Sequence, residues 1–128
     1  MGILKHEELT YKIIGCGMKV FEELGNGYQE LIYQRALAIE IETEKPMFVR
    51  EASMDIFYKN NLNPIGSRRV DFLVGEKVVI ELKATTEFKE EHKAQLLNYL
   101  KVFKIEIGLL FNFGSKTFQV ERFILSST

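Results

Sequence analysis

Two neighbouring stretches near the middle of the chain, residues 68–74 and 77–83, alternate apolar with polar or charged positions. Both are rich in β-branched residues, and Gly75-Glu76 between them is a turn signal, so the pattern predicts a hairpin of two strands. Successive side chains of a strand point to opposite faces. The apolar set expected on one face is Val70, Phe72, Val74, Val78, Ile80 and Leu82, and the opposite face is expected to carry Arg69, Asp71, Glu81 and Lys83.

The register of this hairpin depends on which residues can be buried together. A two-residue loop would bury charge on one side of the hairpin. A three-residue loop pairs Val74 with Val78, and in the same register Asp71 lies directly opposite Glu81. Because register follows the hydrophobic pattern when one face is buried, we expect the three-residue loop.

The two opposed acids carry a chemical consequence. Directly opposed residues have Cβ atoms roughly 4.5–5.5 Å apart, and like charges at that separation are destabilising. Either one carboxyl is protonated or a cation lies between Asp71 and Glu81. A hard divalent cation, held by one or two carboxylates and water, satisfies the pair most simply. Lys83 is expected on the same face, beside whatever such a cation binds.

The rest of the chain divides into helices and strands by the same patterns. Apolar residues at helical spacing predict helices over about residues 8–24, 28–44 and 87–104. Strands are expected at residues 48–51, 53–58, 105–111 and 117–125, with a loop over 59–66 that is rich in turn formers. The predicted order is α-α-β-β-β-β-α-β-β, which indicates an α/β or α+β fold with a mixed sheet. The helix between the Glu81 strand and the Ile107 strand is expected to be a right-handed crossover.

Composition narrows the class of protein. A chain of 128 residues is expected to form a single domain, residues 1–128, because it is too short for two cores. It has no apolar run of membrane-spanning length and no signal-peptide pattern, so a cytoplasmic protein without membrane contact is expected. The single Cys16 is interpreted as a small core residue. A formal net charge of −1 means that any nucleic-acid contact must come from a local patch.

Several polar residues outside the hairpin have ordinary structural explanations. Glu30 falls in a first helical turn, where the helix dipole favours acids, and Tyr33 one turn later could be a core residue. Gln95 and Tyr99 are four residues apart and share a helix face with His92. That face could simply be the polar boundary of an amphipathic helix. The hairpin charges could likewise be ion pairs, Asp71 with Arg69 and Glu81 with Lys83.

Taken together, the motifs resemble a known family. Gly27-x-x-Glu30-x-x-Tyr33, Asp71, Glu81-x-Lys83 and Gln95-x-x-x-Tyr99 occur in the order found in the GxxExxY family of the PD-(D/E)XK nuclease-like superfamily. The resemblance covers nearly the whole chain and implies a restriction-endonuclease-like core, with a mixed sheet flanked by helices. Val70 stands where the superfamily pattern has proline.

The resemblance also implies roles for individual residues. Asp71 and Glu81 would be metal ligands, assisted by the Leu82 carbonyl, and Glu30 would complete the acidic cluster. Lys83 would orient or activate the attacking water and stabilise the charge that develops on phosphorus. Gln95 and Tyr99, which resemble the RecB-like QxxxY motif, would contact substrate. Tyr33 is a further substrate-binding candidate, and Arg69 and His92 are expected to belong to a local basic rim that holds phosphate.

The function expected from these residues is a Mg²⁺- or Mn²⁺-dependent nuclease that hydrolyses phosphodiester bonds by water attack. Its partner would be nucleic acid, with DNA favoured over RNA. The alternative is a non-catalytic module that binds nucleic acid or protein and keeps the acids as a metal site. A homodimer or a protein partner is left open as the source of specificity.

Overall fold

The computed structural model describes residues 6–125, which fold into three helices and a five-stranded sheet. The helices are α1 (Glu7–Leu24), α2 (Glu30–Glu44) and α3 (Glu90–Phe103). The strands are β1 (Phe48–Ile56), β2 (Gly66–Val74), β3 (Val78–Lys83), β4 (Ile107–Asn112) and β5 (Gln119–Ile124).

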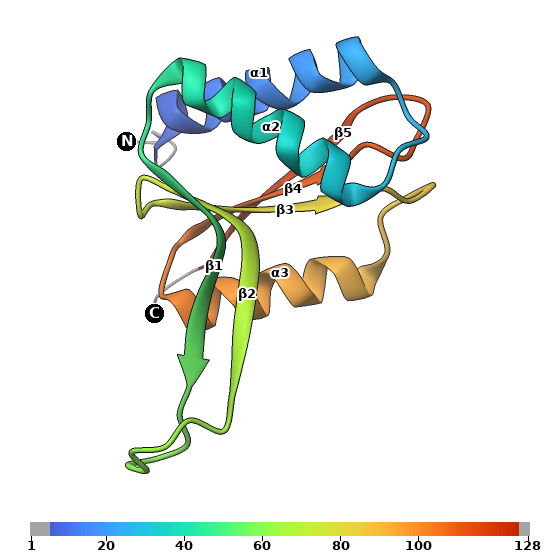
Figure 1. The fold of residues 1–128 in the computed structure, drawn as a ribbon. Coiled ribbons are helices and arrows are strands. Elements are labelled where there is room, and N and C mark those ends of the chain that lie inside the picture. The colour runs from blue at the N-terminus through green and yellow to red at the C-terminus, as the bar shows by residue number, and fades with distance from the viewer. Residues whose placement is uncertain (1–5, 126–128) are drawn as a thin grey trace.

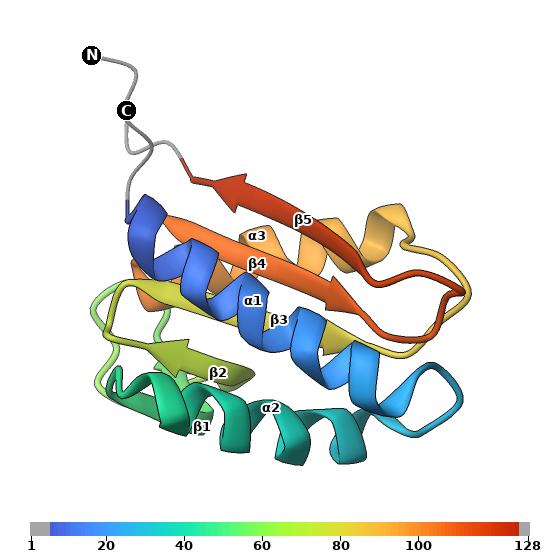
Figure 2. The ribbon, with the colours of Figure 1, turned by 90° about the horizontal axis from the view of Figure 1, so that it is seen from above.

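The elements form three layers, with α1 and α2 on one face of the sheet and α3 on the other (Figure 1). The strand order is β1-β2-β3-β4-β5, and every neighbouring pair is antiparallel except β3 and β4. Seen from the side of α1 and α2, α1 runs over the central strands and α2 lies nearer the β1–β2 edge (Figure 2). The predicted α+β class with a mixed sheet is confirmed, and so is the crossover through α3 between the two parallel strands.

A buried apolar cluster lies on each face of the sheet. Beneath α1 and α2, inward-facing residues of both helices meet alternate residues of β2, β3 and β4, with Tyr33, Phe72 and Phe111 fully buried. Beneath α3, Leu96 and Leu100 pack on Val79 of β3. Because β3 and β4 are covered on both faces, both read as nearly continuous apolar runs.

The β2–β3 hairpin has the predicted register. Val74 pairs with Val78, and the ladder continues to Phe72 opposite Ile80. The turn contains Gly75 and Glu76, both with positive φ angles, 58° and 56°. A three-residue turn therefore sets the register that places Asp71 and Glu81 next in line.

The two strands predicted at residues 48–51 and 53–58 are one continuous strand, β1. Glu51, at its centre, breaks the alternation and adopts a left-handed conformation with φ 49°. Pairing with β2 continues on both sides of it, from Arg50 opposite Phe72 to Ala52 opposite Val70. Backbone pairing with β2 thus carries the strand past a break in the side-chain pattern.

The break at Glu51 also changes which face β2 presents. Val70 packs in the cluster under α3, whereas Phe72 and Val74 pack under α1 and α2. The prediction that these three residues share one face is wrong, because β1 and β2 bend together here and run on as a two-stranded ribbon past α3 (Figure 1). All side chains from 57 to 69, at the outer end of this ribbon, are exposed.

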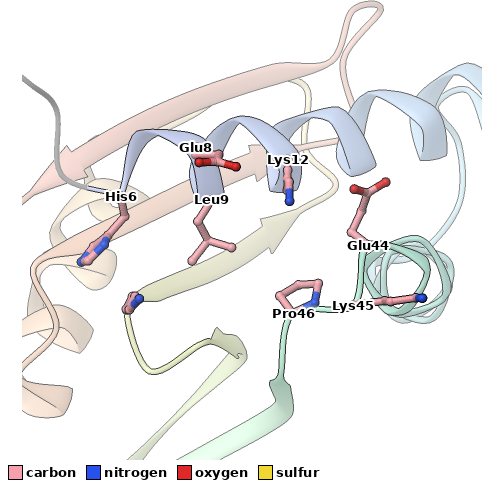
Figure 3. A pocket seen from close by; sticks show the side chains of 8 residues that line it. His6, Glu8, Leu9, Lys12, Glu44, Lys45 and Pro46 are labelled. Atoms are coloured by element: carbon pink, nitrogen blue, oxygen red, sulfur yellow. The ribbon is translucent and has the colours of Figure 1, made fainter.

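No helix within residues 6–125 is long and apolar enough to cross a lipid bilayer. A cavity of about 420 Å³ opens between the start of α1, the end of α2 and the β2–β3 turn (Figure 3). Its lining includes Lys12, Lys45 and Lys77 but none of the predicted site residues. Lys77 stands at the opposite end of the β3 segment from Lys83, so this cavity is separate from the predicted site.

Candidate metal centre

The predicted site lies where β2 and β3 separate. The ladder between the strands ends at Phe72 opposite Ile80, one position before Asp71 and Glu81. Beyond that point each acid takes a backbone N–H from the other strand. The Asp71 N–H donates to Glu81 Oε1 at 2.8 Å, and the Leu82 N–H donates to Asp71 Oδ2 at 2.8 Å. Hydrogen bonds to two carboxyl side chains therefore take the place of the next pair of backbone hydrogen bonds between β2 and β3.

Asp71 is held at its second oxygen by a residue that the sequence analysis did not single out. Gln34, on α2, donates from Nε2 to Asp71 Oδ1 at 2.9 Å and accepts a bond from Arg50 Nη2 at 2.8 Å through Oε1. Its side chain is only 5% exposed. The available signal was a polar residue in the buried stripe of a helix, between Tyr33 and Leu37.

The two acids differ in how readily each holds a proton. Burial, and then the charge of Asp71, raise the pKa of Glu81 to about 8. Burial also raises the pKa of Asp71, but the Leu82 N–H and the Gln34 amide both donate to its carboxylate and oppose that rise. The protein alone thus favours a proton on Glu81 and a charge on Asp71, because two adjacent buried carboxylates cannot both ionise cheaply.

Glu30 is electrostatically coupled to this pair from the first turn of α2. Desolvation raises the pKa of the Glu30 carboxyl, the charge of Lys83 lowers it and the charge of Asp71 raises it again. Glu30 in turn contributes to the raised pKa of Glu81. The three predicted acids therefore share one electrostatic environment.

The structure brings Lys83 and the two residues of the predicted Gln95-x-x-x-Tyr99 element together. Lys83 Nζ donates to Gln95 Oε1 across a distance of 3.2 Å, which links the end of β3 to α3. Tyr99 is 8% exposed, and burial followed by the charge of Glu81 raises the pKa of its phenol. One helix therefore lines the site beside the lysine.

The structure gives three of the substrate-binding candidates other contacts. Tyr33 has no exposed surface, its ring stacks on that of Phe113 with 4.5 Å between the centroids, and its hydroxyl donates to the Gly25 carbonyl, so in this structure it is a core residue. Tyr33 lies in the first turn of α2 on the side that faces the sheet, and side chains there pack in the core. Arg69 lies on the exposed ribbon, 3.9 Å from Glu51. His92 Nδ1 accepts the Lys89 N–H at the start of α3.

The profile of the PD-(D/E)XK nuclease superfamily matches residues 7–123 of this chain. The chain belongs to the PD-(D/E)XK nuclease superfamily. The two strands that separate at the site carry Val70-Asp71 and Glu81-Leu82-Lys83.

Comparison with solved structures supports the fold of this superfamily member. The crystal structure of SSO0001 is similar over 99% of this chain and 72% of its own, with a TM-score of 0.55 and 18% sequence identity. At that identity the likeness concerns the fold alone. No curated protein matches the chain significantly.

The donor set fits a hard divalent cation in its chemistry. Carboxylate and carbonyl oxygens are the preferred ligands of Mg²⁺ and Mn²⁺. Within residues 6–125, however, no three Asp, Glu, His or Cys side chains approach closely enough to hold a metal ion jointly. Asp71 and Glu81 are in contact, but Glu30 is not assembled with them into the predicted three-carboxylate cluster.

A second buried amide fixes the backbone that follows Lys83. The Asn112 side chain, at the end of β4, is fully buried; it accepts the N–H groups of Thr85 and Gly114 and donates to the Thr85 carbonyl. The Phe113 N–H donates to the Lys83 carbonyl at 2.9 Å. The strand predicted at residues 105–111 ends one residue before Asn112, whereas β4 includes it.

Proposed function

We propose that this superfamily member is a Mg²⁺- or Mn²⁺-dependent nuclease that hydrolyses phosphodiester bonds of nucleic acid, DNA rather than RNA. The observation that carries the proposal is the buried pair of Asp71 and Glu81, which must either share a proton or bind a cation, with Lys83 beside it. Such a pair on separating strands is costly for stability and serves to bind a cation. The Gly27-x-x-Glu30-x-x-Tyr33 motif supports assignment to the GxxExxY family.

Asp71 and Glu81 would hold the cation, and Glu30, which is not in contact with them here, would add a third negative charge nearby. The Leu82 N–H points toward Asp71, and the carbonyl of a strand residue points to the same side as its N–H, so the Leu82 carbonyl is available as well. A bound divalent cation supplies Lewis-acid polarisation of a phosphoryl oxygen and favours hydroxide formation from water. Binding would require the proton on Glu81 to leave.

Lys83 would act as a fixed positive charge beside the phosphoryl oxygens. Its bond to Gln95 restricts the ammonium group before substrate arrives, and preorganised charge of this kind stabilises a transition state without reorganisation during the reaction. Tyr99 would shape the wall next to Glu81. Arg69 and His92 would serve as phosphate contacts at the rim.

The experiment is a screen for cleavage of single- and double-stranded DNA and RNA with Mg²⁺, Mn²⁺ or EDTA. Cleavage should require metal and should be lost in Glu81→Ala. Lys83→Ala should abolish cleavage while leaving Mn²⁺ binding largely intact. Lys77→Ala is the matched control, because Lys77 is an exposed lysine just before the other end of the same strand. Equal loss in both lysine variants, or cleavage in EDTA, would contradict the proposal.

Mn²⁺ binding without cleavage of any nucleic acid would instead identify a binding module that keeps the acids as a metal site. Thermal stability that does not respond to Mg²⁺ or Mn²⁺, together with a harmless Asp71→Asn, would mean that the acids only form ion pairs.

A further inference from the structure

Three polar side chains from three different elements form a line that ends at the candidate metal centre. Arg50 of β1 donates to Gln34 of α2 at 2.8 Å, and Gln34 donates to Asp71 of β2 at 2.9 Å. Arg50 is exposed and Gln34 is buried, so the line runs from the surface into the site. None of these bonds lies within one helix or one strand pair, so they form only when all three elements are packed.

The direction of the line is fixed by chemistry. A guanidinium group only donates hydrogen bonds, and an ionised carboxylate only accepts them. The Gln34 oxygen must therefore face Arg50, and its NH₂ group must face Asp71. An amide can normally turn over at little cost, but here the opposite orientation would oppose donor to donor on one side and acceptor to acceptor on the other.

The result is that both oxygens of Asp71 are oriented by donors. The Gln34 amide holds Oδ1 and the Leu82 N–H holds Oδ2, which stops the carboxylate from rotating about its terminal bond. Each carboxylate oxygen has a further lone pair that these bonds leave available. The carboxylate is thus presented to a ligand in a single orientation.

We propose that Gln34 and Arg50 are positioning residues for Asp71: Gln34 orients its carboxylate for the cation, and Arg50 acts through Gln34. This proposal rests on the proposed function, in which Asp71 is a metal ligand. Partners that orient a ligand from behind typically change metal affinity by about 10–100-fold when they are removed. A rival explanation is that the exposed Arg50 contacts substrate phosphate directly.

A double-mutant cycle separates these explanations. The variants are Gln34→Met, Arg50→Met and the double variant, and the first readout is Mn²⁺ affinity measured by calorimetry on the metal-free full chain. Methionine keeps much of the volume of either side chain and removes its hydrogen bonds. Arg35→Met is the matched control, because Arg35 is an exposed arginine next to Gln34 on α2; its Mn²⁺ affinity should equal that of the wild type.

Gln34→Met should weaken Mn²⁺ binding about tenfold. Arg50→Met should weaken it by a smaller factor, and should have no further effect once Gln34 is methionine, since residues that act in series are not additive. Arg50→Lys keeps a donor and should restore part of the loss. In cleavage assays the two single variants should lower kcat at saturating substrate more than they raise KM.

Unchanged Mn²⁺ affinity in folded Gln34→Met would overturn the proposal, leaving Gln34 as a satisfied core residue. Additive effects of the two substitutions, confined to KM, would overturn the part assigned to Arg50 and support direct phosphate contact. If Gln34→Met does not fold, Arg50→Met decides, because an exposed side chain can be replaced without disturbing the core: weaker Mn²⁺ binding supports the proposal and unchanged binding overturns it.

The proposed nuclease activity can fail separately from this proposal. If the wild type binds Mn²⁺ but cleaves nothing, the nuclease assignment fails, and the Mn²⁺ affinities of the variants still decide the positioning role. If the wild type binds no Mn²⁺, both proposals fail.

Discussion

Replacing Glu81 by glutamine should remove a pH-dependent destabilisation that the folded protein carries without metal. Glutamine has nearly the same shape, keeps an oxygen to accept the Asp71 N–H and cannot ionise. In the wild type Glu81 is 7% exposed as a residue, and burial together with the neighbouring charge of Asp71 raises the pKa of its carboxyl from 4.5 to about 8. The folded protein therefore binds this proton more tightly than the unfolded chain does.

The sign and size of the effect follow from linkage. Between pH 4.5 and about 8 the folded state holds a proton that the unfolded state has released, so stability falls as pH rises through this window. The penalty is absent below the window and complete above it. At about 1.4 kcal/mol per pH decade, the interval corresponds to about 5 kcal/mol at its full extent.

Urea unfolding in EDTA at several values from about pH 5 to about pH 8 measures this penalty. The free energy of unfolding of Glu81→Gln, relative to wild type, should rise steadily across that range, by about 3–4 kcal/mol. Adding Mn²⁺ at the upper end should stabilise wild type more than the variant. A constant difference between the two proteins across the range would refute the reasoning, because it would mean that Glu81 is already ionised when the chain is folded.

Three further substitutions test the architecture around the site. Gly114→Ala would place a Cβ 2.3 Å from the Thr85 backbone nitrogen, so thermal unfolding should show a loss of about 3 kcal/mol or more, and an unchanged midpoint would contradict this contact. Asn112→Leu leaves the buried N–H groups of Thr85 and Gly114 without acceptors, so the free energy of unfolding measured in urea should fall by about 1–3 kcal/mol per group. A fall below about 1 kcal/mol would contradict these two hydrogen bonds. Tyr33→Phe removes the hydroxyl bond to a backbone carbonyl, so it should lower stability by about 1 kcal/mol and leave cleavage kinetics unchanged; a raised KM would restore Tyr33 as a substrate contact.

The hairpin shows what the sequence can determine. Its register follows from alternation and turn length, which are local, and both the pairing of Val74 with Val78 and the proximity of Asp71 to Glu81 were predicted correctly. The face of Val70 was predicted wrongly because alternation assumes a straight strand. The bend at Glu51 depends on a backbone conformation that a glutamate rarely adopts.

The parts of the site that were missed depend on tertiary contacts. Gln34 and Asn112 are both amides in otherwise apolar surroundings, and nothing in their neighbours along the chain specifies a partner 37 or 27 residues away. The buried state of Tyr33 likewise depends on stacking against Phe113, which follows β4 and is distant along the chain. Periodicity identifies which face is buried, but only packing decides which polar group is enclosed there.

The outer halves of β1 and β2 form a ribbon that holds the loop at its end away from the candidate metal centre (Figure 1). The loop can therefore change without affecting the site. This loop, residues 57–65, is exposed throughout and belongs to neither apolar cluster. Closing a longer flexible loop costs only about 0.6 kcal/mol for each doubling of its length. Insertions here would therefore extend the surface reached by the protein while leaving the site undisturbed. In evolutionary terms, this loop is where a chain that is otherwise nearly all core can acquire a new binding preference.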